Sequence, residues 1–237
     1  MPDPAIRSNR QPGRVWAALA LAALLAACGG GSRKADVPQY YTVRSGDTLY
    51  SIGWRFGLDY QDIARWNGIG RDYRIYVGQR LELRPRPGGA AARRETPVAP
   101  TAGRGVERPD MLPQPPDWVW PVQGGRVVGA LRQPSGGVGL RIDGTLGQPV
   151  FAAADGKVVY TGSGLRGYGQ LVIINHARGW LSAYGHNSSV LVREEEQVRA
   201  GQRIATMGLG VSQQPMLYFE VRIEGKPVDP LEQLPRR

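Results

Sequence analysis

The chain has very few of the side chains that build disulfides and histidine-based metal sites. Its 237 residues include one cysteine, Cys28, and two histidines, His176 and His186. A single cysteine excludes a disulfide within the chain. A catalytic zinc ion takes about three protein ligands and keeps one coordination position open. The histidines alone cannot supply such a set, and the lone cysteine is better explained by covalent anchoring than by metal binding.

Long uncharged apolar runs are also scarce. Residues 15–27 form such a run, but it has about half the length that a membrane-spanning helix needs. It follows Arg7, Arg10 and Arg14 and ends in Leu-Ala-Ala-Cys at residues 25–28, which resembles the lipobox of bacterial lipoproteins. We therefore expect a signal peptide over residues 1–27, a lipid on Cys28 and a lipidated tether over residues 28–39. An ordinary secretory signal with an unpaired cysteine is the alternative.

The position after the cysteine bears on localisation. It is occupied by Gly29 and not by aspartate. By resemblance to known lipoproteins, this residue implies the periplasmic face of the outer membrane.

The full chain carries a net charge of +10, of which residues 1–27 contribute +2. A basic balance can indicate nucleic-acid binding, but an exported lipoprotein meets little nucleic acid, so we expect no such partner.

The first folded module is expected over residues 40–84. Its apolar spacing and turn residues predict the order strand, helix, helix and strand. The segments that carry this pattern are Tyr-Thr-Val-Arg-Ser-Gly-Asp-Thr-Leu at 41–49, Ile-Ala-Arg-Trp-Asn at 63–67 and Val-Gly-Gln-Arg-Leu at 77–81. Together they resemble the LysM domain, a family that binds the N-acetylglucosamine-containing glycan of peptidoglycan or chitin.

This resemblance implies a shallow glycan groove between two loops. The expected glycan-binding residues are Gly46, Asp47, Thr48, Leu49, Asn67, Gly68 and Ile69. Short polar groups, backbone amides and an apolar edge suit a neutral acetylated sugar. Asp47 and Thr48 also fit a plain helix cap, and both roles can hold at once.

Residues 85–117 are rich in proline and nearly devoid of large apolar side chains. Such a segment cannot bury enough surface to offset the entropy of ordering. It predicts an extended, disordered linker between two modules.

The second module, residues 118–237, shows strands and turns and little helical periodicity. Asp155-Gly156 between apolar runs predicts a hairpin. At residues 216–223 apolar and polar side chains alternate, with Tyr218, Glu220 and Arg222 on one face. We expect a mainly β protein overall, in which a small βααβ module is joined by the linker to a β-sandwich-like domain.

The order of motifs in this module resembles the M23 (LytM) peptidase family. The motifs are Trp-Pro-Val at 120–122, the run at 148–160, Leu-Ser-Ala-Tyr-Gly-His at 181–186 and Leu-Tyr-Phe-Glu-Val at 217–221. Active members are zinc endopeptidases that cut peptidoglycan cross-links, and their fold is the duplicated hybrid motif. By that resemblance Gly139 and Tyr218 stand at two zinc-ligand positions, and Met216 stands at that of a catalytic histidine. Asp143 is the ligand that remains, and His186 matches a second catalytic histidine. We therefore expect no catalytic residues, no bound metal and no cofactor.

A groove without its metal can bind a protein instead. Strand alternation predicts a docking surface that combines strand and loop residues, namely Asp143, Arg166, Tyr168, Tyr184, His186, Tyr218, Glu220 and Arg222. Tyrosine and arginine are common at the energetic centres of interfaces. A polar sheet face exposed to water is the simpler alternative.

Lipobox, LysM domain, proline-rich linker and zinc-less M23 domain together resemble the murein hydrolase activator NlpD family. The resemblance implies a non-catalytic activator of a periplasmic N-acetylmuramoyl-L-alanine amidase, anchored in the outer membrane and bound to peptidoglycan, that promotes septal wall splitting during cell division. Two alternatives stay open: an M23 zinc endopeptidase, and a structural lipoprotein that only ties the outer membrane to the wall.

Overall fold

The computed structural model of the chain describes residues 37–85, 114–133, 136–176 and 178–236. The signal peptide, Cys28 and most of the linker expected over residues 85–117 lie outside the described residues. Those that are described belong to one compact unit, Ala35–Arg237. Within these ranges, no helix has the length and apolarity needed to cross a membrane.

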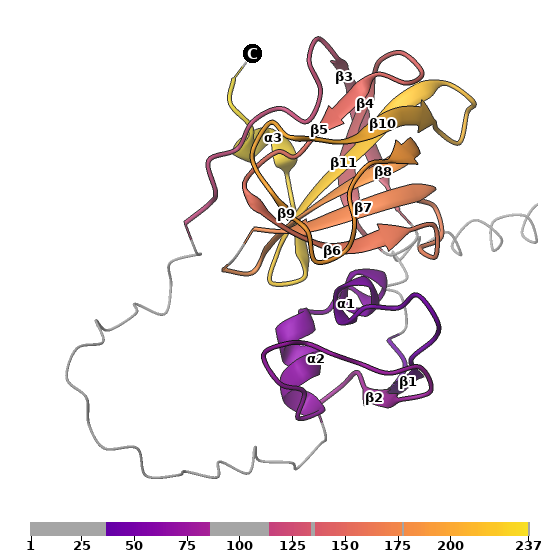
Figure 1. Ribbon diagram of the computed structural model, residues 1–237, viewed down its shortest axis with the longest axis vertical. Coiled ribbons are helices and arrows are strands. Elements are labelled where there is room, and N and C mark those ends of the chain that lie inside the picture. The colour runs from indigo at the N-terminus through magenta and orange to yellow at the C-terminus, as the bar shows by residue number, and fades with distance from the viewer. Residues whose placement is uncertain (1–36, 86–113, 134–135, 177, 237) are drawn as a thin grey trace, which may run out of the picture. The chain divides into compact units, whose positions relative to one another are not determined.

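The first module has the predicted βααβ order. It consists of β1 (Tyr40–Thr42), α1 (Leu49–Phe56), α2 (Tyr60–Trp66) and β2 (Arg80–Glu82), and its two strands pair antiparallel (Figure 1). Thr48 begins α1 through a reciprocal capping box with Ser51. Gly57, with a φ of 65°, ends it in the left-handed conformation that glycine adopts at little cost.

The core of this module lies between the helices and the two strands. Leu49, Ile52, Ile63, Leu81 and Leu83 are fully buried there. These side chains follow the helical and strand periodicities on which the prediction rested.

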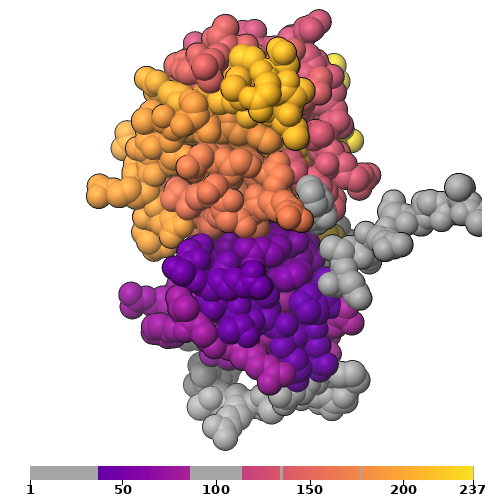
Figure 2. Space-filling view, turned by 90° about the vertical axis from the view of Figure 1, so that its right-hand side faces the viewer, coloured from indigo at the N-terminus to yellow at the C-terminus, as the bar shows by residue number. Residues whose placement is uncertain are grey.

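The second module is mainly β, as predicted. Its elements are β3 (Arg126–Arg132), β4 (Val138–Asp143), β5 (Pro149–Phe151), β6 (Gly156–Gly162), β7 (Gln170–Asn175), β8 (Trp180–Val190), β9 (Gln197–Val198), β10 (Arg203–Leu209), β11 (Pro215–Ile223), β12 (Lys226–Val228) and α3 (Pro230–Gln233). The strands form one sheet whose main order is β3-β4-β11-β10-β8-β7-β6-β9. In addition β11 pairs with β8 and with β12, and β5 pairs with β10. In the space-filling view the residues of this module are coloured from pink to yellow, and those of the first module are indigo and purple (Figure 2).

Strand β11 lies near the middle of this sheet, antiparallel to both β4 and β8. Leu217, Phe219 and Val221 on one of its faces are fully buried in the core of the second module. The side chains of the alternate residues are buried as well, because Tyr218, Glu220 and Arg222 are each exposed by 1% or less. A strand that alternates apolar and polar residues thus lies in a sheet covered on both faces.

The cover over the polar face of β11 comes from the first module. One apolar cluster contains Trp54 and Tyr60 from the helices together with Tyr168, Leu181 and Tyr218 from the sheet domain. The core of the second module is a separate cluster, made only of residues between Trp118 and Leu234.

Candidate functional site

Four polar side chains form a buried cluster on the covered face of β11. The carboxylate of Glu220 accepts hydrogen bonds from the hydroxyl of Tyr218 at 2.7 Å and from that of Tyr168 at 3.1 Å. Its other oxygen accepts from Nε of Arg222 at 2.6 Å. A buried charge pair is tolerated when its remaining polar atoms are also satisfied, and here two tyrosine hydroxyls contribute to that.

Trp54 of α1 covers this cluster. Its indole ring lies 3.9 Å from Cζ of Arg222, in cation–π geometry, and its backbone oxygen accepts a hydrogen bond of 2.8 Å from Nη1 of the same guanidinium. The Tyr168 ring meets the indole edge-on at 6.4 Å between centroids. Burial, followed by the negative charge of Glu220, raises the pKa of Tyr218, so this hydroxyl stays protonated and donates to the carboxylate.

The space around Gly139 shows whether the zinc site of the M23 family can exist in this chain. A Cβ atom at position 139 would lie 2.6 Å from Cζ of Tyr218 and 2.8 Å from its hydroxyl oxygen. The tyrosine ring therefore fills the volume into which a histidine at 139 would project. Within the described ranges, no group of three or more His, Cys, Asp or Glu side chains is placed to hold a metal ion. The residues present do not fit a catalytic zinc ion.

The other predicted groove residues do not all join this cluster. Asp143 and Arg166 are more exposed, and Asp143 lies 3.8 Å from Arg126 in an ion pair. His186 is buried, which lowers its pKa, and it adopts a φ of 60° where β8 leaves regular pairing. Among the described residues its Nε2 has no hydrogen-bond partner.

The expected position of Tyr184 is wrong. Tyr184 pairs directly with Phe219, and Gly185 pairs with Tyr218. Directly opposed residues on antiparallel strands project to the same face, so Tyr184 enters the apolar core away from Tyr218 and Arg222. A prediction that aligned the two strands by their polar residues was out of register by one position.

Tyr184 belongs instead to a buried hydrogen-bonded chain that the sequence reading missed. Its hydroxyl oxygen lies 2.8 Å from Ser182 Oγ and accepts a hydrogen bond from the Ala153 amide at 2.7 Å. Ser182 in turn contacts Nε2 of His176 at 2.6 Å, and Nδ1 of that ring meets the Asp155 carbonyl at 2.8 Å. Burial lowers the pKa of His176 to about 4, so the imidazole is neutral near pH 7.

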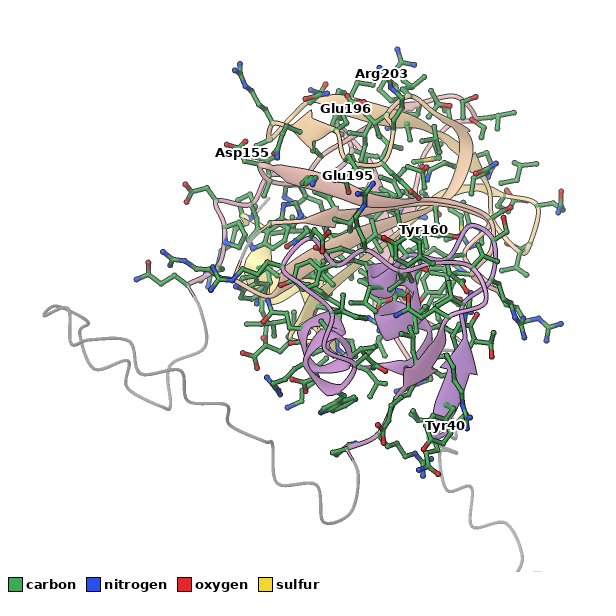
Figure 3. All side chains as sticks on the ribbon, turned by 60° about the horizontal axis from the view of Figure 1, so that its bottom comes forward. Tyr40, Asp155, Tyr160, Glu195, Glu196 and Arg203 are labelled. Carbon is green, nitrogen blue, oxygen red and sulfur yellow. The ribbon has the colours of Figure 1, made fainter. Side chains whose placement is uncertain are left out.

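The predicted glycan-binding residues lie at two places on the first module. Gly46, Asp47, Thr48 and Leu49 surround the start of α1, and Asn67, Gly68 and Ile69 follow α2. Asp47, Thr48 and Leu49 line a cleft of about 460 Å³ with Tyr73, and Glu194 and Glu195 of the second module also line it. Glu195 follows strand β8 and is labelled, with Tyr160 of β6, in Figure 3.

Within that set, the side chains of Leu49 and Asn67 stabilise the fold of the module. The Leu49 side chain is fully buried in the module core. The Asn67 amide donates to the carbonyl groups of Ile63 and Glu82, both at 2.8 Å, and its oxygen accepts from the Glu82 amide at 2.7 Å. Asn67 therefore ties α2 to β2, which leaves its side chain little freedom to bind a sugar.

Comparison with known proteins identifies both modules. The LysM domain family matches residues 41–84, and peptidase family M23 matches residues 135–230. A "Lipoprotein NlpD/LppB homolog" of Pseudomonas aeruginosa is 43% identical over 83% of this chain and 77% of its own length. The lipoprotein YgeR of Escherichia coli is 37% identical over 97% of this chain and 95% of its own length.

A third relative carries a functional name. The "Murein hydrolase activator NlpD" of Escherichia coli is 35% identical over 83% of this chain and 68% of its own length. Each of the three relatives is at least 35% identical and covers 83% or more of this chain. The chain therefore belongs to the NlpD/LppB family of LysM- and M23-containing lipoproteins.

Proposed function

We propose that this protein is a non-catalytic activator of periplasmic N-acetylmuramoyl-L-alanine amidases. One observation carries the proposal: the Tyr218 ring occupies the space next to Gly139 where the zinc ligand of a working M23 peptidase would project. A domain that has lost its metal site but kept the surrounding fold retains a surface for binding. The murein hydrolase activators among its relatives support binding of a peptidoglycan hydrolase over any other role.

Activation then follows from differential binding. The amidase exists in a closed and an open form, and an activator shifts the balance only if it binds the open form better. In this proposal the Tyr168, Tyr218, Glu220 and Arg222 cluster binds the amidase segment that otherwise blocks the amidase active site. The proposal assigns Arg166, Asp143 and His186 to the margin of this binding surface. The metal of the amidase performs the hydrolysis, and this chain contributes only binding energy.

The same proposal places the protein at the cell wall. A lipid on Cys28 anchors it to the periplasmic face of the outer membrane, and the LysM module binds peptidoglycan glycan strands. The activator is thereby held next to the polymer that the amidase cuts. The relatives named as lipoproteins support the anchor, and the LysM match supports glycan binding.

The test is dye release from labelled peptidoglycan by a purified periplasmic amidase, with and without the unlipidated chain from residue 29 onward. We expect faster release with both proteins and none from the chain alone. Release by the chain alone, or a stoichiometric zinc content in it, would support the peptidase alternative. No enhancement of any periplasmic amidase would leave the wall-tethering alternative.

Two exposed arginines supply a matched pair of variants for this assay. Arg166 lies beside Tyr168 in the β6–β7 connection, whereas Arg178 lies in the turn before β8, and both are exposed. Exposed substitutions of this kind change stability little. We expect Arg166→Ala to weaken amidase activation and Arg178→Ala to leave it unchanged. Equal effects of the two substitutions would argue against a role of Arg166 in binding the amidase.

A further inference from the structure

We propose that helix α1 of the LysM module is a built-in cap on the surface that binds the amidase, so that the chain folds into a closed form that must open before it can activate. This inference rests on the proposed function. It adds that Trp54 and the amidase segment compete for one surface.

The contact with Arg222 is the centre of the cap. The guanidinium is 1% exposed, stacks on the Trp54 indole at 3.9 Å and donates to the Trp54 carbonyl at 2.8 Å. That carbonyl belongs to the last turn of α1, where backbone oxygens lack helical partners and carry partial negative charge. A cation on β11 is thus matched to a helix end and an aromatic face, which is a specific fit.

Two further contacts flank this centre. The Asn175 amide lies 3.4 Å from the hydroxyl groups of both Tyr50 and Tyr60. Gly225, in the turn between β11 and β12, lies so close to the connection between α1 and α2 that a Cβ there would be 2.5 Å from the carbonyl carbon of Leu58. The module is therefore held at several points around the cluster.

Two features of this contact nevertheless favour separation of α1 from the sheet. The cluster beneath the other face of the sheet consists only of residues of the second module and stays intact when α1 leaves. Opening does uncover the sheet residues that pack with α1, among them Tyr168, Leu181 and Tyr218. Two buried donors at the contact, Nη2 of Arg222 and Nε1 of Trp54, have no acceptor among the described residues. Buried donors without acceptors cost free energy, and this cost weakens the closed form.

The same unpaired donors indicate which chemical groups an amidase segment needs in order to displace Trp54. A segment that displaces Trp54 gains if it presents an apolar or aromatic side chain to Arg222 and a carbonyl or carboxylate oxygen to Nη2. Because only the open fraction of the chain is competent, closure raises the apparent dissociation constant for the amidase in proportion to the closed population. Opening the cap should therefore lower the concentration of chain needed for activation.

Two glycines allow the cap to be opened without touching the cluster. Gly225 has a φ of +74° and no room for a Cβ, whereas Gly201 has a φ of +75° with nothing within 4 Å. Asparagine tolerates this left-handed conformation better than other residues with a Cβ. Gly225→Asn should thus push away the connection that follows α1, and α1 with it; Gly201→Asn is its control with the same backbone strain. Trp54→Ala removes the indole directly and serves as a second opening variant.

The experiment compares these variants in the unlipidated chain. Hydroxyl-radical labelling of Tyr168 and Tyr218, read by mass spectrometry, reports opening, and dye release reports activation. We expect Gly225→Asn and Trp54→Ala to increase labelling and to lower the half-maximal activating concentration by about 5-fold or more, a shift typical of coupled sites. Gly201→Asn should match the unaltered chain in both.

Two results would overturn the cap. One is increased labelling without a lower activating concentration. The other is unchanged labelling in both opening variants, since the cluster would then not be covered by α1. In either case the unaltered chain still activates the amidase if the proposed function is right. Absence of activation by every form, opened ones included, would refute the proposed function itself.

Discussion

At the scale of single residues, the Tyr218 side chain determines what the remnant of the peptidase site can do. Its ring lies 2.6 Å from where a Cβ at position 139 would be, and its hydroxyl donates to buried Glu220. Restoring a ligand at one position therefore meets a filled volume. Recovery of the metal site needs Tyr218 to be replaced together with Gly139. It also needs the backbone of β11 to shift, because the same Cβ would lie 2.6 Å from the Phe219 carbonyl oxygen.

The first prediction follows from this packing. Gly139→His alone should bind no zinc and should lower the free energy of unfolding by about 1–3 kcal/mol or more, as overpacked cores do. Arg141→His is the control, because it lies two residues along β4 with an exposed side chain and should change stability by less than about 0.5 kcal/mol. Urea denaturation and zinc titration measure both effects. Tight zinc binding by Gly139→His would contradict the geometry.

The second residue-scale prediction concerns His176 and pH. Its pKa is about 4 in the folded chain and near 6.5 when unfolded. Between these values the unfolded chain binds a proton that the folded chain does not, so stability falls as the pH is lowered from about 6.5 to 4. The contribution lost amounts to about 3 kcal/mol, since one pKa unit corresponds to roughly 1.4 kcal/mol.

Comparison with His176→Gln isolates this effect. The variant should be less stable at pH 7, because it disturbs the contacts to Ser182 and to the Asp155 carbonyl. Its deficit should shrink as the pH falls toward 4, because only the unaltered chain loses the histidine contribution. Urea denaturation at several pH values gives the difference. A deficit that stays constant would mean that His176 titrates normally in the folded state.

At the scale of elements, Asn67 distinguishes a structural role from a sugar-binding one. Three hydrogen bonds join its side chain to Ile63 and Glu82. We predict that Asn67→Ala destabilises the LysM module by about 2–4 kcal/mol, because it removes three hydrogen bonds that join α2 to β2. Peptidoglycan binding should be lost in parallel with folding. Gln61→Ala, at an exposed position of α2, is the control.

Thermal denaturation and co-sedimentation with peptidoglycan test this prediction together. Loss of binding by an Asn67→Ala chain that melts normally would instead assign the side chain to the glycan. The structural result would leave the expected groove to Gly46, Thr48, Gly68 and their backbone amides.

The types and order of the elements were largely predictable because they depend on local patterns. The βααβ order follows from helix caps and apolar spacing, and β11 follows from strict alternation at residues 216–223. Which strands pair with one another was harder to predict from the sequence. The hairpin predicted around Asp155-Gly156 is wrong, since β5 pairs with β10, and β6 pairs with β7 and β9. A turn signal indicates a change of direction but not which strands become neighbours.

The register of β8 against β11 shows the same limit. Alternation alone groups Ser182, Tyr184 and His186 on one face, but it cannot say which face of β11 they share. That choice depends on pairing between residues more than thirty positions apart, with Tyr184 opposite Phe219. The bulges beside β8 add further shifts that no periodic pattern contains.

At the scale of the whole molecule, the contact between the modules was not predicted, although one residue signalled it. Trp54 lies on the side of α1 away from Leu49, Ile52 and Phe56, where an amphipathic helix is expected to be polar. A large aromatic residue there indicates a second packing partner. Its identity required the fold, because Trp54 and Arg222 are 168 positions apart.

The net charge leads to the last prediction, which separates two ways in which the chain can hold the wall. Residues from 28 onward carry about +8, and peptidoglycan bears peptide carboxylates, so part of the binding should be electrostatic and screened by salt. Recognition of a neutral glycan by the LysM module should not depend on the salt concentration. Raising NaCl from about 0.05 M to about 0.5 M shortens the Debye length from roughly 14 Å to roughly 4 Å. We expect co-sedimentation with peptidoglycan to weaken over this range while binding to chitin oligosaccharides, followed by calorimetry, stays constant. Chitin binding that fell equally would place the recognition in the charges of the chain and not in the groove around α1.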